Sequence, residues 1–146
     1  MIAYVDSSVL ARAYFADEAG HDAASALLDD TEVALVTGTW SRIEVSGAIV
    51  RACRTGRGDA AALLDLLDAD LSVDGPVTVV AADQHDIESR ALDLVRNHGI
   101  RAMDAWHLAV AAITLPTLAE PAEQQAFATR DQARGEVAAT LGLTVI

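Results

Sequence analysis

The sequence predicts an α/β fold, with a mostly parallel sheet of about five strands and helices on both faces of the sheet. Two observations predict it: short apolar or β-branched runs are typical of buried strands, and segments with helical periodicity separate them. Strands that alternate with helices favour a parallel sheet covered on both sides. With 146 residues, 52% of them hydrophobic, the chain is expected to form one domain over residues 1–146.

The predicted elements follow from local patterns along the chain. The strands are predicted at residues 2–5, 33–36, 77–80, 126–129 and 143–146. Helices are predicted at residues 8–16, 20–28, 39–55, 59–67, 83–99, 102–115 and 131–141. The clearest is the one at 83–99, because Asp83 can cap its start, Ile87, Ala91 and Leu94 recur at three- and four-residue spacing, and Gly99 can end it. Residues 116–125, which hold two of the three prolines, are expected to form an exposed excursion.

The charge balance, taken alone, argues against a nucleic-acid partner. Asp and Glu number 22 against 10 basic residues, and the net charge of −12 repels nucleic acid at long range. All ten basic residues are arginines, and Arg42, Arg51, Arg54 and Arg57 lie within one short region. Guanidinium groups suit phosphates and carboxylates alike, so this clustering leaves both kinds of partner open.

We expect neither a signal peptide nor a membrane span, because Asp6 interrupts the first hydrophobic segment and Arg12 follows soon after. Cys53 is the only cysteine and has no partner for an internal disulfide. A cytoplasmic, reducing location fits these features best.

Two acidic residues directly follow predicted strands. Asp6 ends the first strand and Asp131 follows the fourth, so both are expected at the carboxyl edge of the sheet, where open α/β folds bind ligands. Each has a structural alternative as the N-cap of the next helix. At Asp6, either Ser7 or Ser8 could provide that cap instead, whereas Asp131 taken alone is better explained as a cap.

Two further acidic residues lie on apolar helices. Glu44 has apolar neighbours one turn away, so its carboxylate needs a cation or a donor, and a salt bridge to Arg42 or Arg51 is as good an explanation as a functional role. Asp104 lies near the start of the most apolar helix, where an N-cap or a first-turn acid is a strong alternative because the helix dipole favours negative charge there.

A functional role for the four acids is better supported when they are considered together, because all are expected near one edge of the sheet. Two unit charges about 4 Å apart repel by about 4 kcal/mol at an effective dielectric near 20, so such a cluster needs a cation. Oxygen ligands alone select hard ions, chiefly Mg²⁺ or Mn²⁺. An ion held in this way can polarise a phosphodiester and activate water.

Four strings of the sequence resemble the acidic motifs of PIN-domain nucleases. They are Tyr4-Val5-Asp6-Ser7-Ser8, Ser41-Arg42-Ile43-Glu44-Val45, Met103-Asp104-Ala105-Trp106-His107-Leu108-Ala109 and Thr129-Arg130-Asp131. Their order and spacing over residues 1–146 resemble the VapC toxins. The longer path through residues 116–125 and Arg130 inside the fourth motif depart from the family pattern.

The resemblance implies a PIN-like fold, Mg²⁺- or Mn²⁺-dependent endoribonuclease activity, a homodimer, and a VapB-type antitoxin as partner. By position, Asp6 and Asp104 match the residues most directly tied to the metal, and Glu44 and Asp131 match the remaining acids. Either Ser7 or Ser8 matches a supporting hydroxyl, and Thr129 is a further supporting candidate.

Several interpretations of single residues and of the whole chain stay open. His107 is interpreted as a packed or capping residue and not as a ligand, as are His21, His85 and His98, which lack ligand spacing. An aspartyl-phosphate protein is disfavoured because such sites normally need a Lys and this chain has none. An acidic module that binds an antitoxin, with a vestigial site, is the non-enzymatic alternative. The dimer interface is expected on the helices of residues 39–67, which are rich in Leu, Ala and Val.

Overall fold

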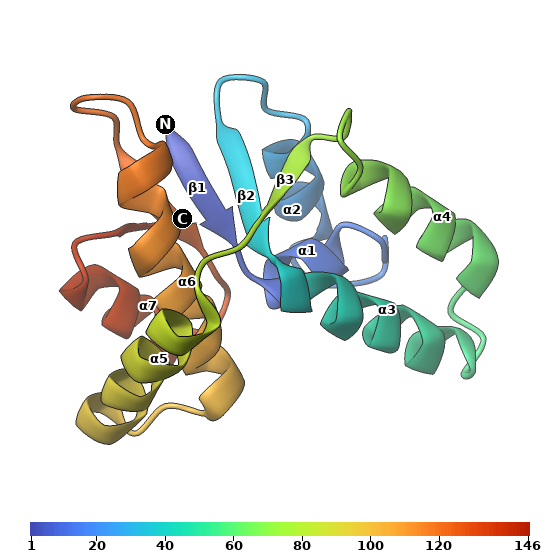
Figure 1. Cartoon of the computed structure of the whole chain (residues 1–146). Helices are drawn as coiled ribbons and strands as arrows, with labels where there is room; N and C mark the ends of the chain where they lie inside the picture. Colours follow the sequence, from blue (N-terminus) through green and yellow to red (C-terminus); the bar gives the residue numbers. More distant parts are fainter.

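A sheet in which all paired strands run parallel passes through the computed structural model, which describes residues 1–146 (Figure 1). Its five strands are β1 (Ile2–Val5), β2 (Ala34–Gly38), β3 (Val77–Val80), β4 (Gln125–Ala128) and β5 (Thr144–Val145). Their order across the sheet is β3-β2-β1-β4-β5. The predicted α/β class, with a parallel sheet of about five strands, is therefore confirmed.

Helices cover both faces of this sheet, as expected. They are α1 (Ser7–Arg12), α2 (His21–Leu28), α3 (Thr39–Cys53), α4 (Ala60–Asp70), α5 (Gln84–His98), α6 (Ala102–Leu118) and α7 (Gln132–Thr140). Helices α5, α6 and α7 pack on one face and α1 to α4 on the other (Figure 1). Successive residues of a strand point to opposite faces, so Ile2 and Tyr4 of β1 enter the first core while Ala3 and Val5 enter the second.

The sheet has a topological switch point between β1 and β4. From β1 the chain adds β2 and β3 on one side, and it later adds β4 and β5 on the other. The backbone N–H of Asp6 donates to the carbonyl oxygen of Ala128 at 3.2 Å, so the carboxyl ends of these two strands lie side by side. Open α/β sheets bind their ligands in the crevice outside such a switch point.

The predicted helix caps agree with the structure at several places. Asp83 caps α5 by accepting from the backbone N–H groups of His85 and Asp86, and Gly99 ends that helix with φ at +67°. Asp59 caps α4 in the same way, although α4 continues to Asp70 and not only to residue 67. Short polar caps are a local feature of the chain, which is why sequence alone located them.

Two further helix boundaries were predicted wrongly. Helix α1 ends at Arg12 and not near residue 16, because the next three residues form tighter bonds, such as that from Tyr14 N–H to the Ala11 carbonyl, which bury Tyr14 and Phe15. Helix α6 continues through Pro116 to Leu118, since a proline in the last turn removes only one helical bond. The expected excursion over 116–125 therefore begins after α6. No helix, α6 included, is long and apolar enough to cross a membrane.

Candidate functional site

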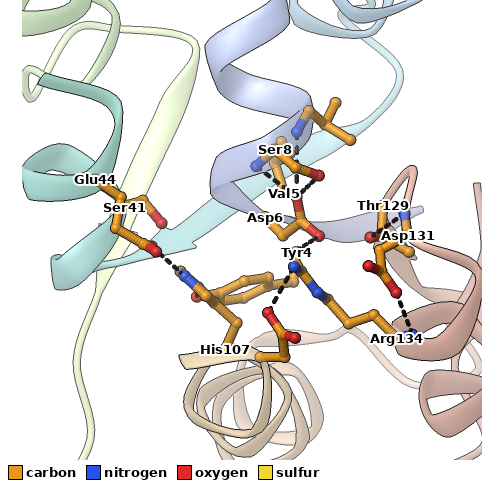
Figure 2. Close-up of polar contacts among 12 residues, drawn as sticks. Tyr4, Val5, Asp6, Ser8, Ser41, Glu44, His107, Thr129, Asp131 and Arg134 are labelled. Atoms are coloured by element: carbon orange, nitrogen blue, oxygen red, sulfur yellow. Dashed lines mark hydrogen bonds and ion pairs between the residues drawn. The ribbon is translucent and has the colours of Figure 1, made fainter. Parts of the chain in front are cut away.

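Asp6 is fully buried at the end of β1 and uses its two carboxylate oxygens differently (Figure 2). Its Oδ1 accepts from the backbone N–H of Ser8 at 2.7 Å, from that of Val9 at 3.1 Å, and from the Ser8 hydroxyl at 2.5 Å. Asp6 itself is thus the N-cap of α1, and the alternative of a serine cap is wrong. Its Oδ2 points away from α1 and accepts from Nη1 of Arg134 at 2.5 Å.

Asp104 approaches the same guanidinium from α6. It lies in the first turn, where the helix dipole favours a carboxylate, while the N-cap position belongs to Arg101, which makes no side-chain cap. Oδ1 of Asp104 accepts from Nη2 of Arg134 at 2.6 Å, and the Asp104 side chain is 18% exposed. One arginine fork therefore bridges the first and third acidic motifs (Figure 2).

Arg134 was missed by sequence reasoning, although it is the cation at this position. It lies in the first turn of α7, and its side chain, 11% exposed, crosses to residues far away in the chain. Its Nε is buried without a hydrogen-bond partner. The sequence signal for a role of Arg134 was weak. It is an arginine three residues after Asp131, at the N-terminal end of a predicted helix, where the helix dipole disfavours a positive charge.

Glu44 lies in α3 and its partner is His107, not Arg42 or Arg51. The His107 Nε2 lies 2.5 Å from Oε2 of Glu44, and we assign the proton to this nitrogen because a carboxylate can only accept. The alternative of a salt bridge from Glu44 to a neighbouring arginine is wrong, since Arg42 instead binds Asp68 on α4. The partner of Glu44 does not lie one turn away on α3, because the Glu44 side chain faces α6.

The pKa of Glu44 reflects this contact. Partial burial raises the pKa of the Glu44 carboxyl, but the hydrogen bond and charge of His107 lower it, and the Ser7 hydroxyl and the Arg134 charge lower it further. The net result is a pKa below the ordinary value of Glu, so this carboxylate is ionised at neutral pH. Ser7 follows Asp6 in the chain, and Arg134 binds Asp6. Their effect on Glu44 therefore links the Glu44–His107 pair electrostatically to the group of Asp6, Asp104 and Arg134.

A buried chain of hydrogen bonds fixes His107 from behind. The Tyr4 hydroxyl lies 2.8 Å from Nδ1 of His107 and accepts from the backbone N–H of Gly38 at 3.0 Å. Burial raises the pKa of the Tyr4 phenol, so Tyr4 stays protonated and donates to Nδ1. His107 is only 1% exposed, so the prediction of a packed histidine is correct but omitted its polar partners.

Asp131 is exposed and caps α7 through the bond from the Arg134 backbone N–H to its Oδ1, at 2.9 Å. The Thr129 hydroxyl oxygen in turn accepts from the Asp131 backbone N–H at 3.2 Å. The structural alternative of an N-cap is therefore correct for this residue. Asp131 reaches the other acids only through Arg134, and Thr129 supports the turn that positions it (Figure 2).

Whether this site can hold a divalent ion depends on how many carboxylates lie close together. No three Asp, Glu, His or Cys side chains lie close enough to hold one ion. Asp6 and Asp104, however, share a single guanidinium, so both already direct an oxygen at one positive charge. Mg²⁺ keeps several waters and is usually held by one or two carboxylates with substrate phosphate, so this pair fits such an ion.

A family model described as PIN domain matches residues 3–133, a range that contains all four acidic motifs. A search of curated proteins found no match.

Proposed function

The chain belongs to the PIN domain family, whose members are generally nucleases, and from this membership we propose that it is an Mg²⁺- or Mn²⁺-dependent endoribonuclease and the toxin of a VapBC-type pair. The observation that carries the proposal is the pairing of Asp6 and Asp104 on one cation at the switch point of the sheet. In that crevice, two carboxylates form a place for a hard cation and for the phosphodiester that it binds.

Asp6 and Asp104 would hold the ion through Oδ2 and Oδ1, the oxygens that now face Arg134. When bound, such an ion polarises the phosphodiester and lowers the pKa of a water nucleophile. Asp6 is suited to this role because its other oxygen is already fixed by three donors from α1, so the side chain is oriented before any ligand arrives.

Glu44 would orient the attacking water and receive its proton. Its lowered pKa keeps it ionised, and His107 holds its Oε2 so that the carboxylate has one defined orientation. Asp131 stands at the exposed rim, where we propose that it orients water or a second ion. Ser7 and Ser8 support the acids, Ser8 by its hydrogen bond to Asp6.

The acidic chain also needs a way to hold RNA, and two arginines beside the site support this part of the proposal. A Cβ on Gly20 would lie 3.8 Å from Cδ of Arg12 and 3.9 Å from Nε of Arg130, so these side chains meet over Gly20. Neither forms an ion pair, and Gly20 begins α2 without a side-chain cap. Two free guanidiniums at a helix N-terminus favour an anion such as an RNA phosphate.

Arg130 also borders an open hollow of about 530 Å³, which Thr129, Asp131 and Glu136 line as well. We propose that the RNA strand passes through this hollow, with one phosphate on Arg12 and Arg130 and another at the acids. The positive charges of Arg12 and Arg130 would offset part of the long-range repulsion from the net charge of −12.

For assembly, we propose a homodimer through α3 and α4, and a basic segment of a VapB-type antitoxin as the partner that covers the site. Ile43 on α3 and Leu66 on α4 are 63% and 55% exposed, and large exposed apolar side chains favour an interaction surface. Light scattering at micromolar concentration tests the dimer, and a monomer would contradict it.

A second candidate is an acidic module that binds an antitoxin without catalysis. The absence of any group of three ligating side chains favours it. The experiment that separates the two incubates the protein with structured RNA and Mg²⁺ or Mn²⁺. We expect cleavage that stops with chelator and with Asp104→Asn, while Asp83→Asn, a helix cap outside the site, stays active. No cleavage by the wild-type protein, together with tight antitoxin binding, would favour the module.

A further inference from the structure

We propose that Arg134 exchanges partners during the reaction: it binds Asp6 and Asp104 when no divalent ion is present, and it binds the scissile phosphate of the substrate when the ion is present. This inference rests on the proposed function, because it assigns a substrate-binding role within the same site. Arg134 lies just beyond residues 3–133 that match the PIN domain model, so the role comes from this chain's own geometry.

The position of Arg134 requires an anion at all times. It lies in the first turn of α7, where the free N–H groups carry partial positive charge and disfavour a cation. The side chain is only 11% exposed, so water cannot fully solvate it. The two aspartates provide the anion in the structure, through both terminal nitrogens of the fork.

Binding of a divalent ion would leave Arg134 without its anionic partners. Asp6 and Asp104 carry two negative charges, and Arg134 balances one of them. A divalent ion balances both, after which Arg134 has lost its two anionic partners. A phosphodiester carries one negative charge and can take the place of these partners.

The shape of the guanidinium suits both partners. Its planar fork forms paired hydrogen bonds with phosphate as well as with carboxylate, which the point charge of a lysine does not do. The Nε of Arg134 is buried without a hydrogen-bond partner, so the two terminal nitrogens, which now bind the aspartates, are the donors offered to a phosphate. The other acids of the site are engaged elsewhere: Glu44 bonds to His107, and Asp131 caps α7.

The first test is an Mn²⁺ titration by calorimetry, without RNA. We expect Arg134→Gln to bind Mn²⁺ more tightly than the wild-type protein, on the order of tenfold, because a competing cation has been removed. Arg134→Lys should fall between them, and Arg96→Gln, which removes an exposed arginine of α5, should match the wild type. Equal or weaker Mn²⁺ binding by Arg134→Gln would overturn the inference, because it would show that Arg134 does not compete with the ion for the two aspartates.

The second test measures RNA binding with Ca²⁺ as the ion and with the RNA checked intact on a gel. We expect Arg134→Gln to lose about tenfold in RNA affinity, and Arg134→Lys to lose less. Unchanged RNA affinity would overturn the phosphate-binding half. If Arg134→Gln does not fold without the ion, as circular dichroism would show, the Lys variant decides both tests.

These outcomes are separable from failure of the proposed function. A wild-type protein that binds Mn²⁺ but cuts no RNA would reject the ribonuclease proposal, while the Mn²⁺ titrations would still decide whether Arg134 competes for the two aspartates.

Discussion

His107 and Glu44 join α6 to α3 through a hydrogen bond of 2.5 Å between Nε2 and Oε2, and this contact fixes the orientation of the one site carboxylate that is neither a helix cap nor bound to an arginine. The imidazole is buried and held from behind by Tyr4, so it is a rigid support for Glu44. Several predictions about the site depend on such contacts between elements.

Replacing His107 by Phe should impair activity through Glu44. An aromatic ring is kept, but the donor that lowers the pKa of Glu44 is lost, so this pKa should rise. We expect kcat/KM to fall roughly ten- to hundredfold and the acidic limb of the pH–rate profile to move to higher pH. His85→Gln, an exposed histidine on α5, should leave the profile unchanged. A lower rate with an unmoved acidic limb would contradict the role of His107.

Glu44 should stabilise the fold in a pH-dependent way. Its folded pKa lies below its ordinary value of 4.5, so its contribution is fully present above about that pH and is lost as the pH falls through the folded pKa. Urea unfolding at pH 7 should therefore show Glu44→Gln to be less stable than the wild type, and the difference should shrink in acid. The control Glu32→Gln, exposed before β2, should show no such pattern. A Glu44→Gln difference that persists below the folded pKa would count against the assignment.

Gly38 should not tolerate a side chain. Its Cβ would lie 2.7 Å from both the Tyr4 hydroxyl and Cζ3 of Trp106, in the core behind His107. We expect Gly38→Ala to cost about 1–3 kcal/mol in the free energy of unfolding. The matched control is Gly47→Ala in α3, where the new Cβ meets only the flexible end of Arg51 at 3.0 Å and should gain roughly 0.5–1 kcal/mol. Equal stability of the two variants would be the contrary result.

Arg12 and Arg130 should contribute to RNA binding without affecting metal binding. Replacing both by Gln should weaken RNA uniformly across sequences and reduce the slope of log K against log salt by about 2. Arg42→Gln is the control for net charge, because Arg42 is already paired with Asp68. An unchanged salt slope in the double variant, or an equal change in the control, would place the RNA elsewhere.

The fold could be predicted from the sequence because its signals are local. Apolar runs located the strands, and capping residues such as Asp83 and Gly99 located helix ends. Asp6 and Asp131 were placed at the carboxyl edge because they directly follow strands. The prediction was weaker for α1 and α6, whose ends are set by burial of Tyr14 and Phe15 and by tolerance of Pro116 in a last turn.

The contacts within the site could not be predicted in the same way. Arg134 reaches Asp6 across 128 positions of sequence, and His107 reaches Glu44 across 63. Such pairs depend on how α6 and α7 pack against the sheet, and no local pattern encodes that packing. The apolar surroundings of Glu44 did show that it needs a partner, but they did not show which element provides it.

The most direct test of the central claim, that Asp6 and Asp104 together hold a divalent ion, is an Mn²⁺ binding isotherm for Asp6→Asn. Asparagine caps a helix as well as aspartate does, so α1 should persist while the charge is removed. We predict that Asp6→Asn weakens Mn²⁺ binding by more than about 100-fold, beyond the loss typical of residues that only support a ligand. The control Asp83→Asn should bind like the wild type. An Asp6→Asn protein that folds and binds Mn²⁺ as tightly as the wild type would contradict the account.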